Sequence, residues 1–218
     1  MLSHHKREYV EIPVETRKAI HNTIELQPGS SSLAALLKDI HTEIRKFPDF
    51  TALVEAAHKF TPSKETPSFC ATLSHDEQYN LSLVGIHRFA PLPVHDHPDT
   101  DGALLVVHGR VQVRNYRVEE SVRNPSLVRL QCLSEKILAA GSVATIDHST
   151  NNLHGLQAMN LTSVCLVFHT PPLVEKQQAW YFPTHPLAIH SEHATWNRVV
   201  KRPRRIDAPH NCSPQFNP

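Results

Sequence analysis

The segment PLPVHDHPDTDG, residues 91 to 102, carries the most informative pattern in the sequence. If this segment is a strand, His95 and His97 point to the same side, because side chains alternate between the two faces of a strand. Two imidazoles at this spacing can bind one metal ion. His154, in the segment TNNLH, stands shortly before another predicted strand and is the best candidate for a third neutral ligand. The sequence therefore predicts a metal site formed by His95, His97 and His154.

Short runs with strand character lie on both sides of this segment. Alternating or β-branched apolar residues indicate strands within 79–83, 103–107, 111–113, 128–132, 142–146 and 163–168. The tripeptide HGR lies between two of these runs and predicts a hairpin, since Gly109 accepts a positive φ without steric cost. Many short strands without intervening helices predict a mainly β architecture, an antiparallel barrel or sandwich, from Phe69 to Phe182.

The first 60 residues read as helical. Ser31 or Ser32 can cap a first helix, in which apolar residues recur at spacings of three and four: Leu33, Leu36, Leu37, Ile40 and Ile44. A second short helix follows Asp49. We therefore expect one domain in three parts. These are a helical extension packed on the barrel (1–60), the barrel itself (61–195) and a flexible C-terminal tail (196–218).

Composition narrows the classes of function. The chain has 218 residues, 40% of them hydrophobic, and a formal net charge of +1, so no global field would recruit nucleic acid or a membrane surface. The basic run near the C-terminus, within 201–205, reads as solvated tail. Four cysteines without paired spacing, and no apolar stretch of membrane-spanning length, favour a reducing compartment, the cytoplasm. The 17 histidines point to metal or proton chemistry.

A known motif connects the histidine pair to the glycine that follows it. The first motif of cupin proteins is H-x-H, four residues, a position that is often Glu, six residues and Gly, and His95, His97 and Gly109 match it. The position that is often Glu is Gly102, and Asp101 is one residue out of register, which would turn it to the opposite face of the strand.

A cupin motif with glycine in the acidic position resembles the thiol dioxygenases, which include cysteine dioxygenase, cysteamine dioxygenase and the plant cysteine oxidases. A third ligand histidine and a strand that ends in Pro-Pro also match, at His154 and in LVFHTPPL (166–173). The resemblance covers about residues 69 to 182, and PVHDHP is most similar to the cysteamine and plant cysteine oxidase branch. An arginine that grips the carboxylate of cysteine would be expected near 69–72, and its absence argues against free cysteine as the substrate.

The resemblance implies a fold, a metal and a reaction. The fold is a small antiparallel β-barrel, or jelly roll, with N-terminal helices, and the metal is Fe(II) on the three histidines. The reaction adds both atoms of O2 to the sulfur of a small thiol, such as cysteine, cysteamine or 3-mercaptopropionate, and gives a sulfinic acid without an organic cofactor. Three neutral imidazoles leave the full charge of the ion available to a thiolate, whereas a carboxylate ligand would reduce it.

Further residues have two possible roles each. His169 is a candidate catalytic proton donor near the metal, or a hydrogen-bonded core histidine. Tyr181 and Trp180 follow the Pro-Pro and either wall the site, Tyr181 as a catalytic and Trp180 as a substrate-binding residue, or pack in the core. Arg88 and Arg114 are candidate anchors for a substrate carboxylate, or solvent-facing strand residues.

Asp96 points away from the two histidines beside it, so we expect a structural hydrogen bond rather than metal ligation. Cys165 reads as a buried apolar side chain. Two other classes of function stay open: a different metal enzyme, either a dioxygenase acting on a carbon substrate or an isomerase that uses zinc, nickel or manganese, and a binding protein whose small ligand fills the barrel without reaction. The sequence leaves the identity of the thiol and the oligomeric state open.

Overall fold

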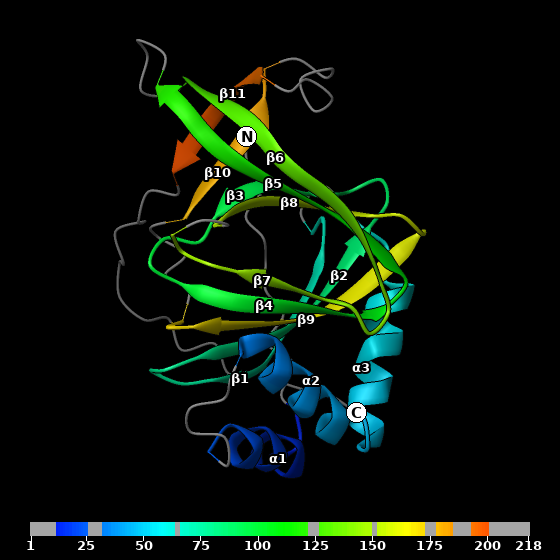
Figure 1. Ribbon diagram of the computed structural model, residues 1–218. Helices are drawn as coiled ribbons and strands as arrows, with labels where there is room; N and C mark the ends of the chain where they lie inside the picture. Colours follow the sequence, from blue (N-terminus) through cyan, green and yellow to red (C-terminus); the bar gives the residue numbers. More distant parts are fainter. Residues whose placement is uncertain are drawn as a thin grey trace, which may run out of the picture.

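The computed structural model describes residues 12–25, 32–63, 66–121, 127–149, 152–172, 178–184 and 193–200. In these ranges three helices are followed by eleven strands (Figure 1). The helices are α1 (Val14–Glu25), α2 (Leu33–Ile44) and α3 (Pro48–Lys59). The strands are β1 (Phe69–His75), β2 (Asn80–His87), β3 (Leu92–Asp96), β4 (Asp101–His108), β5 (Arg110–Ser121), β6 (Leu127–Ala139), β7 (Val143–Ile146), β8 (Leu153–Ala158), β9 (Thr162–Thr170), β10 (Ala179–Pro183) and β11 (His193–Val200). Among the described helices, none has both the length and the apolar character needed to cross a membrane.

The strands form two antiparallel sheets. One sheet has five strands in the order β1-β2-β9-β4-β7, and the other closes into a barrel in the order β10-β11-β6-β5-β8-β3. In Figure 1 the five-stranded sheet lies between the helices below and the closed barrel above. The predicted mainly β architecture, a small antiparallel barrel with N-terminal helices, is confirmed.

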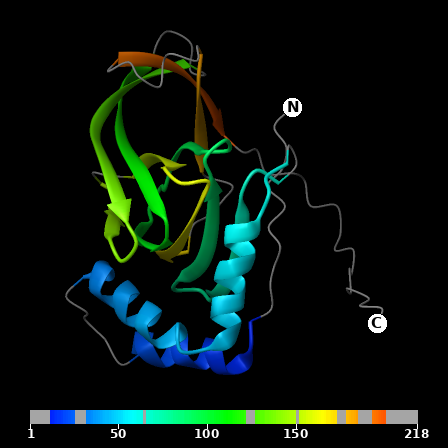
Figure 2. The same cartoon turned by 90° about the vertical axis from the view of Figure 1, so that its right-hand side faces the viewer.

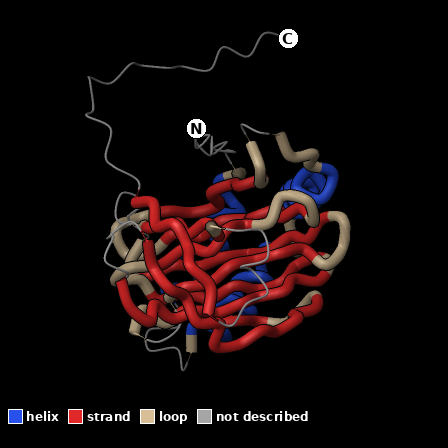
Figure 3. The backbone as a smooth tube through the Cα atoms, turned by 90° about the horizontal axis from the view of Figure 1, so that it is seen from above, coloured by secondary structure: helices blue, strands red, loops and turns tan. Residues whose placement is uncertain are grey.

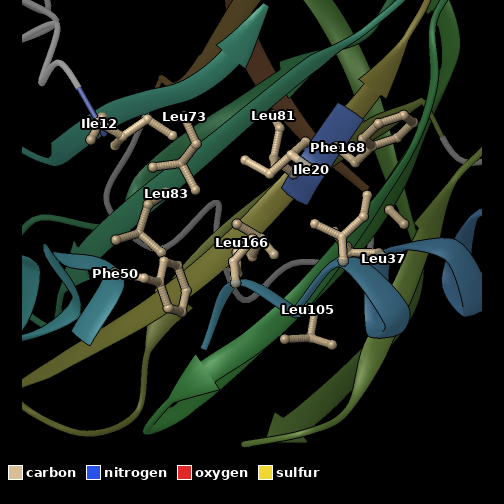
Figure 4. Packing of buried hydrophobic residues seen from close by; sticks show 14 of the residues in the cluster. Ile12, Ile20, Leu37, Phe50, Leu73, Leu81, Leu83, Leu105, Leu166 and Phe168 are labelled. Carbon is tan, nitrogen blue, oxygen red and sulfur yellow. The ribbon is translucent and has the colours of Figure 1, made fainter. Parts of the chain in front are cut away.

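The helices pack against the five-stranded sheet (Figure 2). Helix α2 begins where predicted, because the Oγ atom of Ser32 accepts a hydrogen bond from the backbone N–H of Ala35 at 3.2 Å. Its predicted apolar side is buried, and Leu37 belongs to one cluster with Leu105 of β4 and Leu166 of β9 (Figure 4). Helix α1, a further helix in the region expected to be helical, joins the same cluster.

A second apolar layer lies between the two sheets. Strand β9 has both faces covered: Leu166 and Phe168 belong to the cluster on the helical side, whereas Cys165 and Val167 belong to the cluster between the sheets. The rest of that second cluster comes from both sheets: Ile86, Leu104, Val106, Val111, Val113, Leu156 and Ala158. In the view from above, the strands lie over the helices (Figure 3). Cys165 is fully buried, as predicted.

The predicted hairpin at Gly109 is wrong. Strand β4 pairs with β7 and β9 in the five-stranded sheet, whereas β5 pairs with β6 and β8 in the barrel. Gly109 therefore turns a corner from one sheet to the other. The requirement for glycine is real, because its φ is +80° and a Cβ atom there would stand 2.7 Å from the Oγ atom of Ser163.

The predicted tail begins too early in the sequence. Residues 196–200 belong to β11, which pairs with β6 and β10. Trp196 is buried, and its ring packs edge-on against Tyr116 with the centroids 5.7 Å apart. The aromatic side chain thus fills the interior of the closed barrel. Residues 201–218, with the basic run, lie outside the described residues.

Replacing Leu37 by alanine tests the helical layer. Leu37 is fully buried in the cluster between helices and sheet, so Leu37→Ala should lower the free energy of unfolding by about 2–5 kcal/mol. Urea denaturation followed by circular dichroism measures this change. Lys38→Ala, at the exposed neighbouring position, is the control and should change the free energy of unfolding by less than about 0.5 kcal/mol. Equal stability of the two variants would contradict the packing described.

Candidate metal centre

Pairing between β3 and β8 brings together two of the three predicted ligands. His95 on β3 stands directly opposite His154 on β8 in the antiparallel register. Side chains of directly paired residues lie on the same face of a sheet, and the two ring centroids are 4.8 Å apart. Residues from distant parts of the chain therefore converge through backbone pairing alone.

His97 joins the pair from just beyond the end of β3. Its backbone N–H donates a hydrogen bond to the carbonyl oxygen of Asn152 at 2.9 Å, which continues the contact between the two segments. The His97 ring centroid lies 4.8 Å from those of both His95 and His154. One nitrogen from each of the three histidines lies within 4.8 Å of the others. The structure thus assembles the predicted triad.

The three imidazoles are buried and suited to bind a cation. Their exposed fractions are 4% for His95, 2% for His97 and 4% for His154. Burial, followed by the neighbouring histidines, holds the pKa of His97 and of His154 well below the usual value, so both rings are neutral at neutral pH. Both ring nitrogens of His97 lack a hydrogen-bond partner among the described residues. A buried nitrogen without a hydrogen bond costs free energy that a bound metal would offset.

One ligand ring is oriented by contacts on two sides. The Nδ1 atom of His95 lies 2.8 Å from the carbonyl oxygen of Pro93, which favours a proton on Nδ1 and leaves Nε2 for the metal. The indole ring of Trp180 stacks on the imidazole, with centroids 4.8 Å apart and an interplanar angle of 24°. Trp180, which is paired with His95 across β10 and β3, therefore lies beside the ligands, and its role in substrate binding stays a prediction.

The acidic position of the motif has no room for a side chain. A Cβ atom on Gly102 would stand 2.5 Å from the carbonyl oxygen of Phe168 and 3.2 Å from a ring carbon of His169. Asp101, one residue earlier, instead accepts hydrogen bonds from the backbone N–H and the ring of His148, at 3.0 and 2.7 Å. Asp101 is thus turned away from the triad, as predicted, and the nearby ligands are all neutral.

A fourth histidine stands beside the triad. His169 on β9 pairs with Gly102 on β4. Its ring lies face to face with that of His97, with centroids 5.0 Å apart and an interplanar angle of 27°. The structure therefore brings His169 to the site but leaves its predicted role, proton donor or core histidine, to experiment.

Tyr181 does not face the triad. It is paired with Val94, whose side chain lies on the opposite face of β3 from His95, and both belong to the apolar cluster inside the closed barrel. Its hydroxyl donates a hydrogen bond to Asp96 at 3.2 Å. This position favours the alternative prediction for Tyr181, a residue packed in the core, because neighbouring residues on one strand point in opposite directions. Asp96 makes the structural hydrogen bond that was predicted.

The two predicted substrate anchors also lie away from the histidines. The Nε atom of Arg114 donates to the carboxylate of Glu135 at 2.7 Å, and Arg114 stands opposite Gly155 of β8, on the other face of the strand from His154. Arg88 is exposed in the turn after β2, where its backbone N–H donates to Leu161. The exposure of Arg88 favours the alternative prediction, a solvent-facing residue, whereas the Arg114 side chain is only 15% exposed and is paired with Glu135.

Sequence reasoning missed one residue beside the triad. Asn115 on β5 stands directly opposite His154 on β8, and its Nδ2 atom donates to the Oγ atom of Ser134 at 3.0 Å. Asn115 and His154 come from strands whose register cannot be read from either sequence segment. No local pattern around Asn115 signals this proximity.

Comparison with known proteins places the chain in a family. The family model described as PCO_ADO, which covers the plant cysteine oxidases and cysteamine dioxygenase, matches residues 36–213, most of the chain. The chain belongs to this family. The PCO_ADO proteins are thiol dioxygenases with the cupin fold, so the resemblance found from the motifs is confirmed.

Several solved structures are similar to parts of the chain. KdgF from a Halomonas species has 20% identity and a TM-score of 0.37, over 48% of this chain and 81% of that one. The cupin domain of Cnp3 from Schizosaccharomyces pombe has 11% identity and a TM-score of 0.38, over 52% and 70%. A protein from Bacillus halodurans has 15% identity and a TM-score of 0.41, over 56% and 80%. No curated protein sequence matches the chain.

Removing one histidine tests the metal centre. His154→Ala deletes one of three ligands, so the affinity for Co(II), measured by titration of the apoprotein, should fall by more than the roughly 10–100-fold typical of losing a residue that only supports a ligand. His75→Ala removes an exposed histidine at the end of β1 and is the control. Equal Co(II) affinity in the two variants would show that the triad is not the metal site.

Proposed function

We propose that the protein is a non-haem iron thiol dioxygenase that oxidises a small thiol to its sulfinic acid with O2. One observation carries the proposal: three buried histidines, with glycine at the acidic motif position, in a chain of the PCO_ADO family. Both oxygen atoms enter the product. Sulfur gives up four electrons and O2 accepts four, so the reaction needs no further reductant.

The donor set supports iron and a thiolate. Imidazole ligands add no negative charge, and burial lowers the pKa of His97 and of His154, which keeps both rings neutral. Bound Fe(II) would supply the redox chemistry that couples a thiol to O2, and the charge that neutral ligands leave on it favours an anionic sulfur. Intracellular thiols stay reduced in the cytoplasm, which is where we place the reaction.

The residues around the triad favour certain thiols. Arg114 is engaged by Glu135, and Arg88 is exposed in a turn. Neither therefore supports binding of a carboxylate beside the sulfur. Among cysteine, cysteamine and 3-mercaptopropionate, this arrangement favours cysteamine. Trp180, stacked on His95, offers an aromatic surface next to the ligands.

Oxygen uptake tests the reaction. Iron-loaded protein should consume O2 only when a thiol is added, with one O2 taken up per thiol lost and a product heavier by two oxygen atoms. The thiols to compare are cysteine, cysteamine, 3-mercaptopropionate and a peptide with an N-terminal cysteine. His154→Ala is the negative control and His75→Ala the positive one. Tightly bound zinc or nickel, with no O2 uptake for any thiol, would favour a different metal enzyme or a binding protein.

His169 gives a second test of the site. We propose that His169 acts as a proton donor next to the metal, because its ring stacks on that of His97. His169→Gln should keep the iron content and lower kcat by about 10²–10⁴-fold, the range of general acid–base catalysis. Iron content by elemental analysis and initial rates of O2 uptake measure the two effects. An unchanged kcat would assign His169 to the core.

A further inference from the structure

Strand β10 closes the barrel through a short contact with β3. It comprises five residues, Ala179–Pro183, and pairs with β3 at two positions, Trp180 with His95 and Tyr181 with Val94. Its other edge pairs with β11. The ring that stacks on a ligand histidine is therefore carried by a strand with little ladder pairing on the ligand side. Contacts other than the β3–β10 ladder are therefore needed to fix the position of the Trp180 indole relative to His95.

Asp96 supplies that additional connection. One carboxylate oxygen of Asp96 accepts a hydrogen bond from the backbone N–H of Ala179 at 2.6 Å, and the other accepts from the hydroxyl of Tyr181 at 3.2 Å. Asp96 lies between two ligand histidines in sequence, yet both of its oxygens are used on β10. Hydrogen bonds to a charged acceptor are stronger than those between neutral groups.

The same arrangement extends to the third strand. Arg198 on β11 pairs with Tyr181 across the ladder, and its positive charge acts on both Asp96 and Tyr181. Asp96 on β3, Tyr181 on β10 and Arg198 on β11 thus interact across the three strands. The tyrosine hydroxyl is used in this connection, on the face of the sheet opposite the triad.

We propose that Asp96 is a positioning residue of the metal centre: by fastening β10 to β3 it holds the Trp180 indole flat against the His95 imidazole. The inference rests on the proposed metal centre. His95 then has its rotation set by the Pro93 carbonyl on Nδ1 and its plane set by the stacked indole. Both constraints aim Nε2 at the ion before it binds, which lowers the ordering cost of ligation.

Co(II) binding with two optical readouts tests the proposal on the full chain. The variants are Asp96→Leu, which keeps the size but removes both acceptors, Asp96→Asn, which keeps the acceptor for Ala179, Tyr181→Phe, and the control Asp39→Asn. Asp39 is exposed on helix α2. The d–d spectrum reports the ligand geometry. Quenching of tryptophan emission by Co(II), with Trp180→Phe as the reference, reports the distance of the indole from the ion.

Asp96→Leu should bind Co(II) about 10–100-fold more weakly, with a changed d–d spectrum and less quenching of Trp180. Asp96→Asn should recover most of the affinity, Tyr181→Phe should lose a smaller part, and Asp39→Asn should match the parent. A purely structural Asp96 would lower the urea midpoint of the apoprotein but leave the Co(II) spectrum and quenching unchanged, which would overturn the inference.

Two further outcomes are distinguishable. If Asp96→Leu does not fold, Asp96→Asn and Tyr181→Phe decide: parent-like spectra and quenching in both would overturn the inference, and graded losses would support it. If the parent itself binds no Co(II), the metal centre and hence the proposed function fail, and the inference fails with them. A parent that binds Co(II) beside unaffected Asp96 variants defeats the inference alone.

Discussion

The register between β3 and β8 is the constraint on which the rest of the structure depends. It sets His95 opposite His154, and the bond from the His97 backbone to Asn152 extends the same contact by one more ligand. Because side chains alternate along a strand, a slip by one residue would turn a ligand into the apolar interior of the closed barrel and bring Val94 or Leu153 to the site. The hydrogen-bond ladder therefore determines the donor set, and the flanking apolar residues on the other face secure that register by their burial.

The layers around this ladder bury the three histidines, and this burial has a thermodynamic consequence. Helices cover one face of the five-stranded sheet, and the cluster between the sheets fills the other face beside the histidines. Burial keeps His97 and His154 neutral by lowering the pKa of each. The ring nitrogens of His97 have no hydrogen-bond partner in the described part of the chain, a state that costs about 1–3 kcal/mol per group. An ion bound there removes this cost for one of the two nitrogens, so metal binding and stability of the fold are coupled.

Local sequence patterns predicted what is local. The spacing of Leu37 and its apolar neighbours predicted α2 with its serine cap, and the alternation of apolar and polar residues predicted most of the central strands. The histidine motif and the TNNLH segment predicted the three ligands. Pairing between distant strands is not encoded locally, and the errors follow from that. Gly109 signals a sharp turn whether the next strand pairs with the previous one or crosses to another sheet. Tyr181 and Trp180 are equally aromatic, and only the register with β3 shows which of them faces His95.

Gly102 and His169 form a linked pair that accounts for the neutral donor set. They stand opposite each other on β4 and β9, and a Cβ atom on Gly102 would press on the His169 ring and on the backbone of Phe168. A carboxylate at position 102 would therefore require β4 and β9 to separate locally, although Leu166 and Phe168 of β9 are packed against the helices. The close approach of β4 and β9 thus excludes an acidic ligand by sterics and leaves a fourth imidazole in its place. Since neutral ligands preserve the charge of a bound ion, this backbone proximity favours a thiolate as the partner of the metal.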